Sequence, residues 1–384
     1  MQFRNSKNNL HFCSLIRIFA HEMDIFGNTS IQAILFFVLY GITGVVPLIA
    51  AFYMLLRRAN AIAPSVTPPV RLRCWTASFF AVSSLAHVWW LLFYILSRDQ
   101  NSLSYLVLVI LDCVLLFITF AGTLLTMLQD RRRPVWPALV AMIPFMAITV
   151  AYMVYPNSHL EEFAAAYLLL LSLVFTGYMA VSIRQYGQWL NDNYADLENK
   201  KVWLCQAIAL VCMLLFILYV LADDIVILWL IHIIELVIVG LLLWRVETMP
   251  LLELPTQSQT QQPTAAPVTI DLTHIEQLLK EKCVAQQLYL QHDLTLEQLA
   301  QAIGTNRFYL SQYFSRQSIT YNTYINNLRI NYFIKRYEDT VAAQQSVSAQ
   351  QLAQESGFRS YSTFGRAFTQ RTGQSVTAWM RGAE

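Results

Sequence analysis

Four ionisable side chains lie inside long apolar stretches of this chain. They are His87, Asp112, His232 and Glu235, and His232 precedes Glu235 by one helical turn on the same face. Ionisable groups at the depth of a bilayer are costly and usually face a protein interior or a cavity. We interpret these four side chains as candidates for a ligand pocket or a proton-sensitive switch. The alternative is that they only hold neighbouring helices together through hydrogen bonds.

A second group of side chains, near the C-terminal end, has the chemistry needed to contact DNA. Leu310 and Phe314 are spaced to face a protein core, and Phe364 and Phe368 repeat this spacing further along the chain. The opposite face of each helix is then available for other contacts. The side chains on these faces are Arg307, Phe308, Ser311, Gln312 and Ser315 in the first helix and Tyr361, Ser362, Gly365 and Arg366 in the second.

These side chains match the groups with which proteins read double-stranded DNA. Gln312 has the amide that pairs with adenine, Arg366 has the guanidinium that pairs with guanine or a phosphate, and Phe308 can contact a thymine methyl group. The alternative for any one of them is a solvated helix face. Beyond residue 306 basic side chains outnumber acidic ones, which favours a phosphate-binding surface; the basic ones are Arg307, Arg316, Arg329, Lys335, Arg336, Arg359, Arg366, Arg371 and Arg381.

The chain has no motif that indicates an enzyme or a cofactor-binding protein. A glycine-rich phosphate loop, HExxH and GxSxG are all missing from the sequence. The six cysteines form no CxxC pair, and Cys74, Cys113, Cys205 and Cys212 lie in apolar stretches as small hydrophobic residues would. We therefore expect no catalytic residue, no metal site and no cofactor.

The apolar stretches are long enough to cross a lipid bilayer, which is the second expected partner. Of the 384 residues, 56% are hydrophobic and only 13% are charged, unlike an ordinary soluble domain. A membrane-spanning helix takes roughly 20 mainly apolar residues. Seven segments meet this requirement, at about 31–56, 74–97, 103–128, 135–155, 163–183, 202–222 and 225–244.

Lysine and arginine in the connecting loops predict the orientation of these spans. Basic residues gather in the first, third and fifth loops and after the last span, namely Arg57, Arg58, Arg71, Arg73, Arg131, Arg132, Arg133, Arg184, Lys200, Lys201 and Arg245. The second loop has only Arg98, and the fourth and sixth loops carry Glu161, Glu162, Asp223 and Asp224 instead. Because basic loops stay in the cytoplasm, we expect a multi-pass protein of the inner (cytoplasmic) membrane with its N-terminus outside and its C-terminus inside.

Two polar stretches flank the apolar region. The N-terminal tail carries Arg4, Lys7 and Arg17, which resist export, and it lacks the cleavage site of a signal peptide. We therefore expect translation to start at Met23, and the alternative is a basic tail that is tolerated outside. The stretch before the C-terminal region is rich in Pro, Gln and Thr, as flexible linkers are. The predicted parts are a tail at 1–30, a transmembrane domain at 31–245, a linker at 246–269 and a DNA-binding domain at 270–384.

The C-terminal region contains a helix-turn-helix pattern twice. Residues 295–298 form a capping box that begins a helix, and residues 348–351 repeat it. The other predicted features are an amphipathic helix over 271–292, tight turns at Gly304 and Gly357, an N-cap at Asn306 and a connecting apolar helix around 324–337. One such pattern is a weak signal, whereas two copies at this spacing are a strong one.

With the motifs LAQAIG…YLSQYF, YNTYINNLRINY, LAQESGF…STFGRAF and RTGQS, the chain resembles the AraC/XylS family of transcription regulators over about 270–384. The resemblance implies an all-helical domain whose two recognition helices enter successive major-groove segments of DNA. Ser318 and Val376 depart from the family pattern, which has Gly and Pro there, and this affects details of the turns. The apolar part is outside the resemblance, although the layout and the YADLENKKVW loop are similar to membrane-anchored regulators of Bacteroidetes.

The loop at 184–203 is polar, aromatic-rich and longer than a minimal turn. It is either a short surface helix that passes movements of the spans to the soluble domain or only a solvated connection.

The full prediction is an all-α protein with a seven-helix transmembrane bundle and a C-terminal double helix-turn-helix DNA-binding domain. Such a protein would be a one-component transcription regulator. Its further partners would be a signal, either a small molecule or a protein, and a second copy of the chain in a homodimer. The alternatives are a transporter or channel with a vestigial C-terminal domain, and a membrane anchor that senses nothing.

Overall fold

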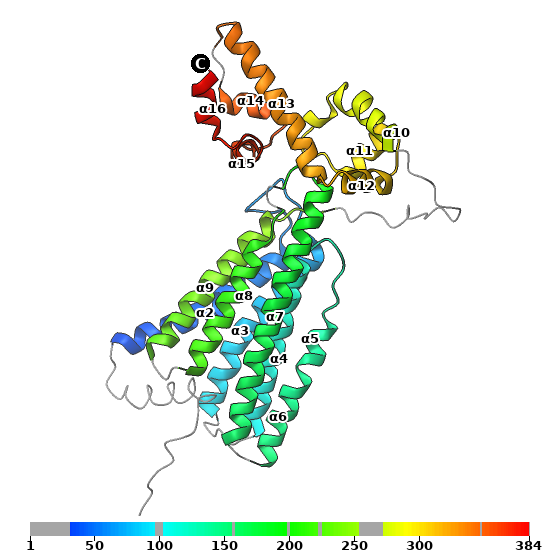
Figure 1. Ribbon diagram of the computed structural model, residues 1–384. Helices are drawn as coiled ribbons and strands as arrows, with labels where there is room; N and C mark the ends of the chain where they lie inside the picture. The colour runs from blue at the N-terminus through cyan, green and yellow to red at the C-terminus, as the bar shows by residue number, and fades with distance from the viewer. Residues whose placement is uncertain are drawn as a thin grey trace, which may run out of the picture. The chain divides into compact units, whose positions relative to one another are not determined.

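The computed structural model describes residues 31–96, 103–155, 158–197, 200–221, 225–252, 272–345 and 348–383 (Figure 1). Across these ranges the regular elements are helices, and the extended backbone is limited to one isolated bridge between Tyr194 and Thr295. The chain divides into two compact units. The apolar unit comprises residues 1–184 and 202–252, and the C-terminal unit comprises residues 185–201 and 253–384. The predicted tail at 1–30 and linker residues 253–269 lie outside the described ranges.

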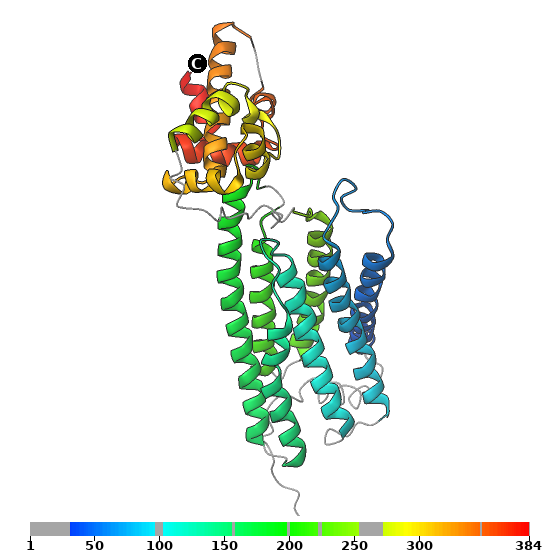
Figure 2. The ribbon, with the colours of Figure 1, turned by 90° about the vertical axis from the view of Figure 1, so that its right-hand side faces the viewer.

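The apolar unit is a bundle of helices that lie alongside one another (Figures 1 and 2). Helix α2 packs against α3 and α9, α3 packs against α4, and α8 packs against α9. The bounds are α2 Ile31–Leu56, α3 Val70–Leu96, α4 Leu103–Thr126, α5 Trp136–Ala141, α6 Ile143–Val154, α7 Ser158–Asn193, α8 Trp203–Leu221 and α9 Ile225–Thr248. Many large aliphatic side chains on these helices face outward, as expected for surfaces that contact lipid.

Six helical segments in the described part of the chain are long and apolar enough to cross a membrane. They correspond to six of the seven predicted spans. The remaining one, predicted at 202–222, is helix α8, which contributes the shorter apolar stretch Trp203–Leu215 to the described part of the chain. The number seven therefore stays a prediction.

Two of the apolar segments differ in detail from the prediction. The segment at 135–155 is divided into α5 and α6 at Met142, and Pro144 lies in the first turn of α6. Proline has no backbone NH and its ring crowds the preceding turn, so a continuous helix cannot pass this point undistorted. Helix α7 continues to Asn193, ten residues beyond the predicted end at 183, so part of the predicted 184–203 loop is helical.

The C-terminal unit contains two pairs of helices joined by a long helix. The bounds are α10 Leu272–Leu278, η2 Leu279–Val284, η3 Leu288–Leu290, α11 Leu296–Ile303, α12 Arg307–Arg316, α13 Tyr321–Ala342, α14 Ala349–Glu355, α15 Tyr361–Thr372 and α16 Val376–Ala383. The first pair, α11 and α12, packs in a first core with Leu299 and Leu310, and the second pair, α14 and α15, packs in a second core with Phe364 and Phe368. Helix α13 contributes to both cores.

The helix ends follow local sequence signals in most places. The capping box at residues 295–298 is confirmed, because Thr295 accepts a hydrogen bond from the backbone of Gln298 and the Gln298 side chain accepts one in return. Asn306 caps α12 as predicted. Gly304 and Gly357 have positive φ angles of 82° and 89°, which explains the need for glycine at both turns.

Two predictions about helix ends are wrong. Ser348 makes no capping hydrogen bond with its side chain, and Gln351 instead donates to Glu355 one turn later (2.9 Å), so the second capping box is not formed. The predicted helix over 271–292 is not continuous either. Gln287 has a left-handed backbone (φ 56°), which ends the helical path before η3.

Candidate functional site

Helix α12 presents the predicted DNA-contacting side chains on the face opposite its buried residues. Leu310 and Phe314 are buried at the inner face, as the spacing predicted, and Tyr313 is buried beside them. Phe308 is 54% exposed, so much of its ring is open to solvent. The other predicted positions are exposed at Ser311 and Ser315 and partly buried at Arg307 and Gln312.

Helix α15 repeats this arrangement. Phe364 and Phe368 are fully buried at its inner face. The Ser360 hydroxyl caps the helix by accepting a hydrogen bond from the backbone NH of Thr363 (3.3 Å). The predicted positions are exposed at Tyr361, Ser362 and Arg366 and partly buried at Gly365. Each helix pair therefore offers one capped helix with a polar outer face, as a DNA-reading helix requires.

Not every basic residue of this unit is available for phosphates. Arg329 was counted in the predicted phosphate surface, but its side chain is fully buried, so this assignment is wrong. Helical periodicity alone could not place it, because Arg329 is buried by partners far away in the sequence. Arg359, which belongs to the same predicted set, is 62% exposed and lies just before the N-cap of α15, so it remains a candidate for a phosphate contact.

The predicted ligand or switch residues of the apolar unit come together around one cavity of about 530 Å³. Nε2 of His87 lies 3.6 Å from Oε2 of Glu235, and Ser83 donates a hydrogen bond to the other carboxylate oxygen of Glu235. The rings of His87 and His232 are 5.7 Å apart, and the Tyr40 ring lies close to both. The sequence singled out these residues as candidates for one pocket, and the structure shows which of them are in contact.

Asp112 lies on the wall of the same cavity. One of its carboxylate oxygens accepts a hydrogen bond from Nε1 of Trp90 (3.2 Å), while the other is buried without a hydrogen-bond partner among the described residues. Among the described residues, the rest of the lining is mostly apolar and aromatic and contains no lysine or arginine. A cavity with a few converging polar groups in apolar walls is the usual form of a small-molecule site.

Metal binding has no support in the described parts of either unit. No cluster of three or more His, Cys, Asp or Glu side chains there is arranged to hold an ion. The free cysteines are dispersed among the helices, and Cys205 and Cys283 are buried.

Comparison with known proteins identifies the C-terminal region. Residues 299–382 match the family model described as "Helix-turn-helix domain", which covers the chain from within α11 to α16. No curated protein and no solved structure gives a significant match. The family match supports the resemblance to AraC/XylS regulators over this region and suggests a DNA-binding transcription regulator, because the matched family is a DNA-binding regulator domain and not an enzyme family.

Proposed function

We propose that this protein is a membrane-embedded, one-component transcription regulator that reads promoter DNA with two helix-turn-helix units. The observation that carries the proposal is the presence, in one chain, of a matched helix-turn-helix domain and, among the described residues, six helical segments apolar enough to span a bilayer. A DNA-binding domain has to face the cytoplasm, and the distribution of basic loops favours the same side for the C-terminus.

In this proposal α12 and α15 each enter a major-groove segment. Their contacts would come from Arg307, Phe308, Ser311, Gln312 and Ser315 on α12 and from Tyr361, Ser362, Gly365 and Arg366 on α15. Both helices expose polar or aromatic side chains near their N-terminal ends, which is where recognition helices usually touch base edges. Exposed arginines at the same surface would contact phosphates and make binding sensitive to salt.

The test uses full-length protein in lipid nanodiscs and DNA selected from a random library. Arg366→Ala is expected to weaken binding to the selected sequence by about 1–3 kcal/mol if Arg366 reads a base edge. Arg58→Ala removes the same charge from an exposed position of the apolar unit, outside the C-terminal unit, and is the matched control. Failure of the parent protein to select any sequence would refute the proposed function.

The orientation in the membrane is tested separately. Cysteines are introduced at exposed Arg132 and exposed His159 in a chain whose Cys13 and Cys74 are replaced by serine. An impermeant maleimide should label the cysteine at position 159 in intact cells and the cysteine at position 132 only after permeabilisation. The opposite pattern would place the C-terminal unit outside the cell.

We further propose that the cavity lined by His87, Asp112, His232 and Glu235 receives the signal. Its aromatic walls and the unpaired Asp112 oxygen favour a small amphipathic molecule that donates a hydrogen bond to the carboxylate. Glu235→Gln is expected to change signal-dependent transcription while leaving membrane insertion and DNA affinity intact. Glu162→Gln, at the far end of α7, is the control.

The same cavity favours one alternative function. Carboxylates inside membrane-spanning helices also occur in transporters, where they bind the solute or a proton. This alternative is tested with vesicles that contain the full chain. Uptake of solute by the parent that is lost in Asp112→Asn, while Asp112→Asn leaves transcription unchanged, would support a transporter. In a second experiment the bundle is exchanged for an unrelated membrane anchor. Unchanged regulation of transcription would show that the bundle senses no signal.

A further inference from the structure

The C-terminal unit includes a short piece of chain that is far from it in the sequence. Residues 185–201, here called the inserted segment, connect α7 to α8 and pack within the C-terminal unit. Ala195 is fully buried in the first core, and its backbone NH donates to the carbonyl of Leu294 (3.2 Å). The Asn322 amide on α13 donates to the carbonyls of Tyr194 (3.2 Å) and Ala195 (2.6 Å). The inserted segment is therefore built into the unit rather than resting on its surface.

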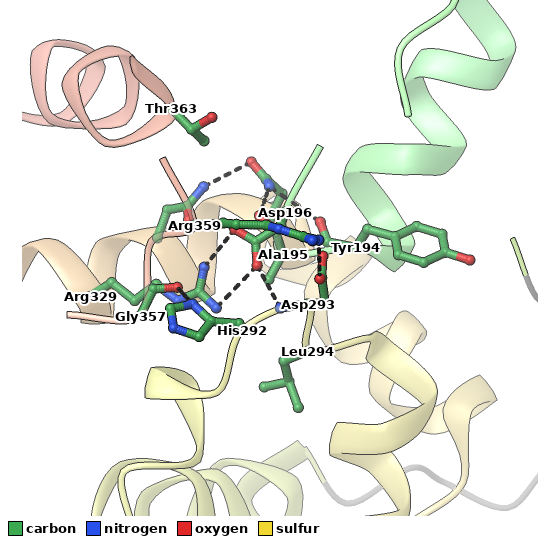
Figure 3. Close-up of polar contacts among 12 residues, drawn as sticks. Tyr194, Ala195, Asp196, His292, Asp293, Leu294, Arg329, Gly357, Arg359 and Thr363 are labelled. Carbon is green, nitrogen blue, oxygen red and sulfur yellow. Dashed lines mark hydrogen bonds and ion pairs between the residues drawn. The ribbon is translucent and has the colours of Figure 1, made fainter. Parts of the chain in front are cut away.

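Asp196 and Arg329 form a buried ion pair at the centre of this contact (Figure 3). Their side chains are 2% and 0% exposed, and Nη1 of Arg329 lies 3.1 Å from Oδ1 of Asp196. Oδ2 of Asp196 also accepts a hydrogen bond from the backbone NH of Asp293 (2.8 Å). Charges removed from water are costly unless they are paired and hydrogen-bonded, so Arg329 depends on this carboxylate for its buried position.

Arg329 contacts both helix pairs of the unit. Its Nε donates to the carbonyl of Tyr289 (2.7 Å) and its Nη2 to the carbonyl of Gln291 (2.7 Å), in the stretch that leads into the first pair. Its guanidinium lies 5.5 Å from the centre of the Phe358 ring, in the turn of the second pair. The charge that Asp196 balances therefore lies at the junction between the two pairs.

A second set of contacts connects the inserted segment to the beginnings of α12 and α15. Asn193 accepts a hydrogen bond from Nη2 of Arg307, the first residue of α12 (2.6 Å). Lys200 pairs with one carboxylate oxygen of Asp293 (3.1 Å), and Arg359 pairs with the other (2.6 Å). Arg359 directly precedes the N-cap of α15. The segment thus contacts α12 directly and, through Asp293, the residue that precedes the N-cap of α15.

These contacts matter because the two helix pairs have separate hydrophobic cores. Because no single core contains both α12 and α15, apolar packing alone does not fix their relative orientation. That orientation depends on α13 and on the polar contacts at the junction. Two linked DNA-reading elements gain affinity from each other only when their geometry allows both to bind at once. A change in their mutual orientation would therefore weaken binding to a two-part site but not to either part alone.

We propose that Asp196 is a positioning residue for DNA recognition, which holds Arg329 and thereby fixes the orientation of α12 relative to α15. The inserted segment is then a part of the DNA-binding domain that lies, in the sequence, between two apolar stretches. This inference rests on the proposed function, because it requires that both helices contact DNA. The segment is continuous with α7 at one end and leads to α8 at the other, so it is covalently joined to helices of the apolar unit.

The test compares two DNA fragments with the full-length protein in lipid nanodiscs. The first is the sequence that the parent protein selects from a random library, and the second has one of the two contacted segments scrambled. Asp196→Asn is expected to lower affinity for the first fragment at least tenfold and to change affinity for the second less than twofold. Asp192→Asn makes the same charge change at an exposed position of the inserted segment, and it should match the parent on both fragments.

Equal affinity of Asp196→Asn and the parent for the intact fragment would overturn the inference. If Asp196→Asn loses both fragments, Arg329→Lys decides, because a lysine keeps a charge beside Asp196 but cannot hold the carbonyls of Tyr289 and Gln291 as the guanidinium does. A selective loss of the intact fragment in Arg329→Lys supports the inference, whereas a parallel loss or no loss overturns it. A parent protein that selects no DNA refutes the proposed function, and the inference with it.

Discussion

Replacing Gly357 with alanine tests how tightly the two helix pairs are joined. Gly357 has a φ of +89°, and a Cβ atom there would lie 2.8 Å from the carbonyl oxygen of Leu290 and 3.0 Å from Nε of Arg329. His292 adds a hydrogen bond to the carbonyl of Gly357 (3.1 Å). The turn of the second pair is therefore pressed against the backbone that leads into the first pair, with no room for a methyl group.

Two costs add up at this position. A left-handed backbone costs an alanine about 1 kcal/mol. Displacing a close backbone neighbour costs about 2 kcal/mol more, which is typical of overpacking. We therefore expect Gly357→Ala to destabilise the junction by about 3 kcal/mol, the sum of these two values. Gly373 is the matched control, because its φ is +76° but a Cβ atom there would meet nothing within 4 Å, so Gly373→Ala should cost only the conformational part.

Hydrogen exchange of the full-length protein measures this difference locally. Since about 1.4 kcal/mol corresponds to a tenfold change, amides of α14 and α15 should exchange about 100-fold faster in Gly357→Ala and about fivefold faster in Gly373→Ala. Amides of α3, in the apolar unit, should exchange at the parent's rate in both variants. Equal acceleration by the two substitutions would refute the reasoning, because it would mean that the close approach to Leu290 and Arg329 has no energetic consequence.

Three further outcomes are expected. Partial burial alone would raise the pKa of Asp293, but the charges of Lys200 and Arg359 lower the pKa below its usual value. The ionised carboxylate therefore stabilises the fold at pH values above the unfolded pKa of about 3.9. The free energy of unfolding of Asp293→Asn, measured with denaturant, should be lower than that of the parent at pH 6. This difference should shrink as the pH falls below about 4. Burial raises the pKa of the Cys283 thiol to about 12, so iodoacetamide at pH 8 should modify Cys283 only after unfolding; rapid labelling of the native protein would contradict its burial. Thr295→Ala removes the cap of α11 and should lower the local stability of that helix, measured by hydrogen exchange, by about 1 kcal/mol. An unchanged exchange rate would mean that the cap does not stabilise the helix.

Much of this protein could be predicted from local sequence patterns. The apolar segments, the buried pairs Leu310 and Phe314 or Phe364 and Phe368, and the caps at Thr295 and Asn306 all depend on neighbours within a turn or two. Periodicity and capping are short-range effects, so the sequence determines them almost directly. The second capping box failed for an equally local reason, because Gln351 found a competing partner one turn along the helix.

The tertiary structure decided what the polar residues do. Asp196 and Arg329 are separated by 133 positions, and no local pattern predicts that an arginine on a polar helix is buried against a carboxylate from a distant loop. The same holds for the cavity, where residues from separate apolar helices, among them His87 and Glu235, meet only after those helices have packed. Burial of a charge depends on which partners the fold brings within hydrogen-bond distance, and that information resides in the packing of whole elements rather than in the spacing of residues along one of them.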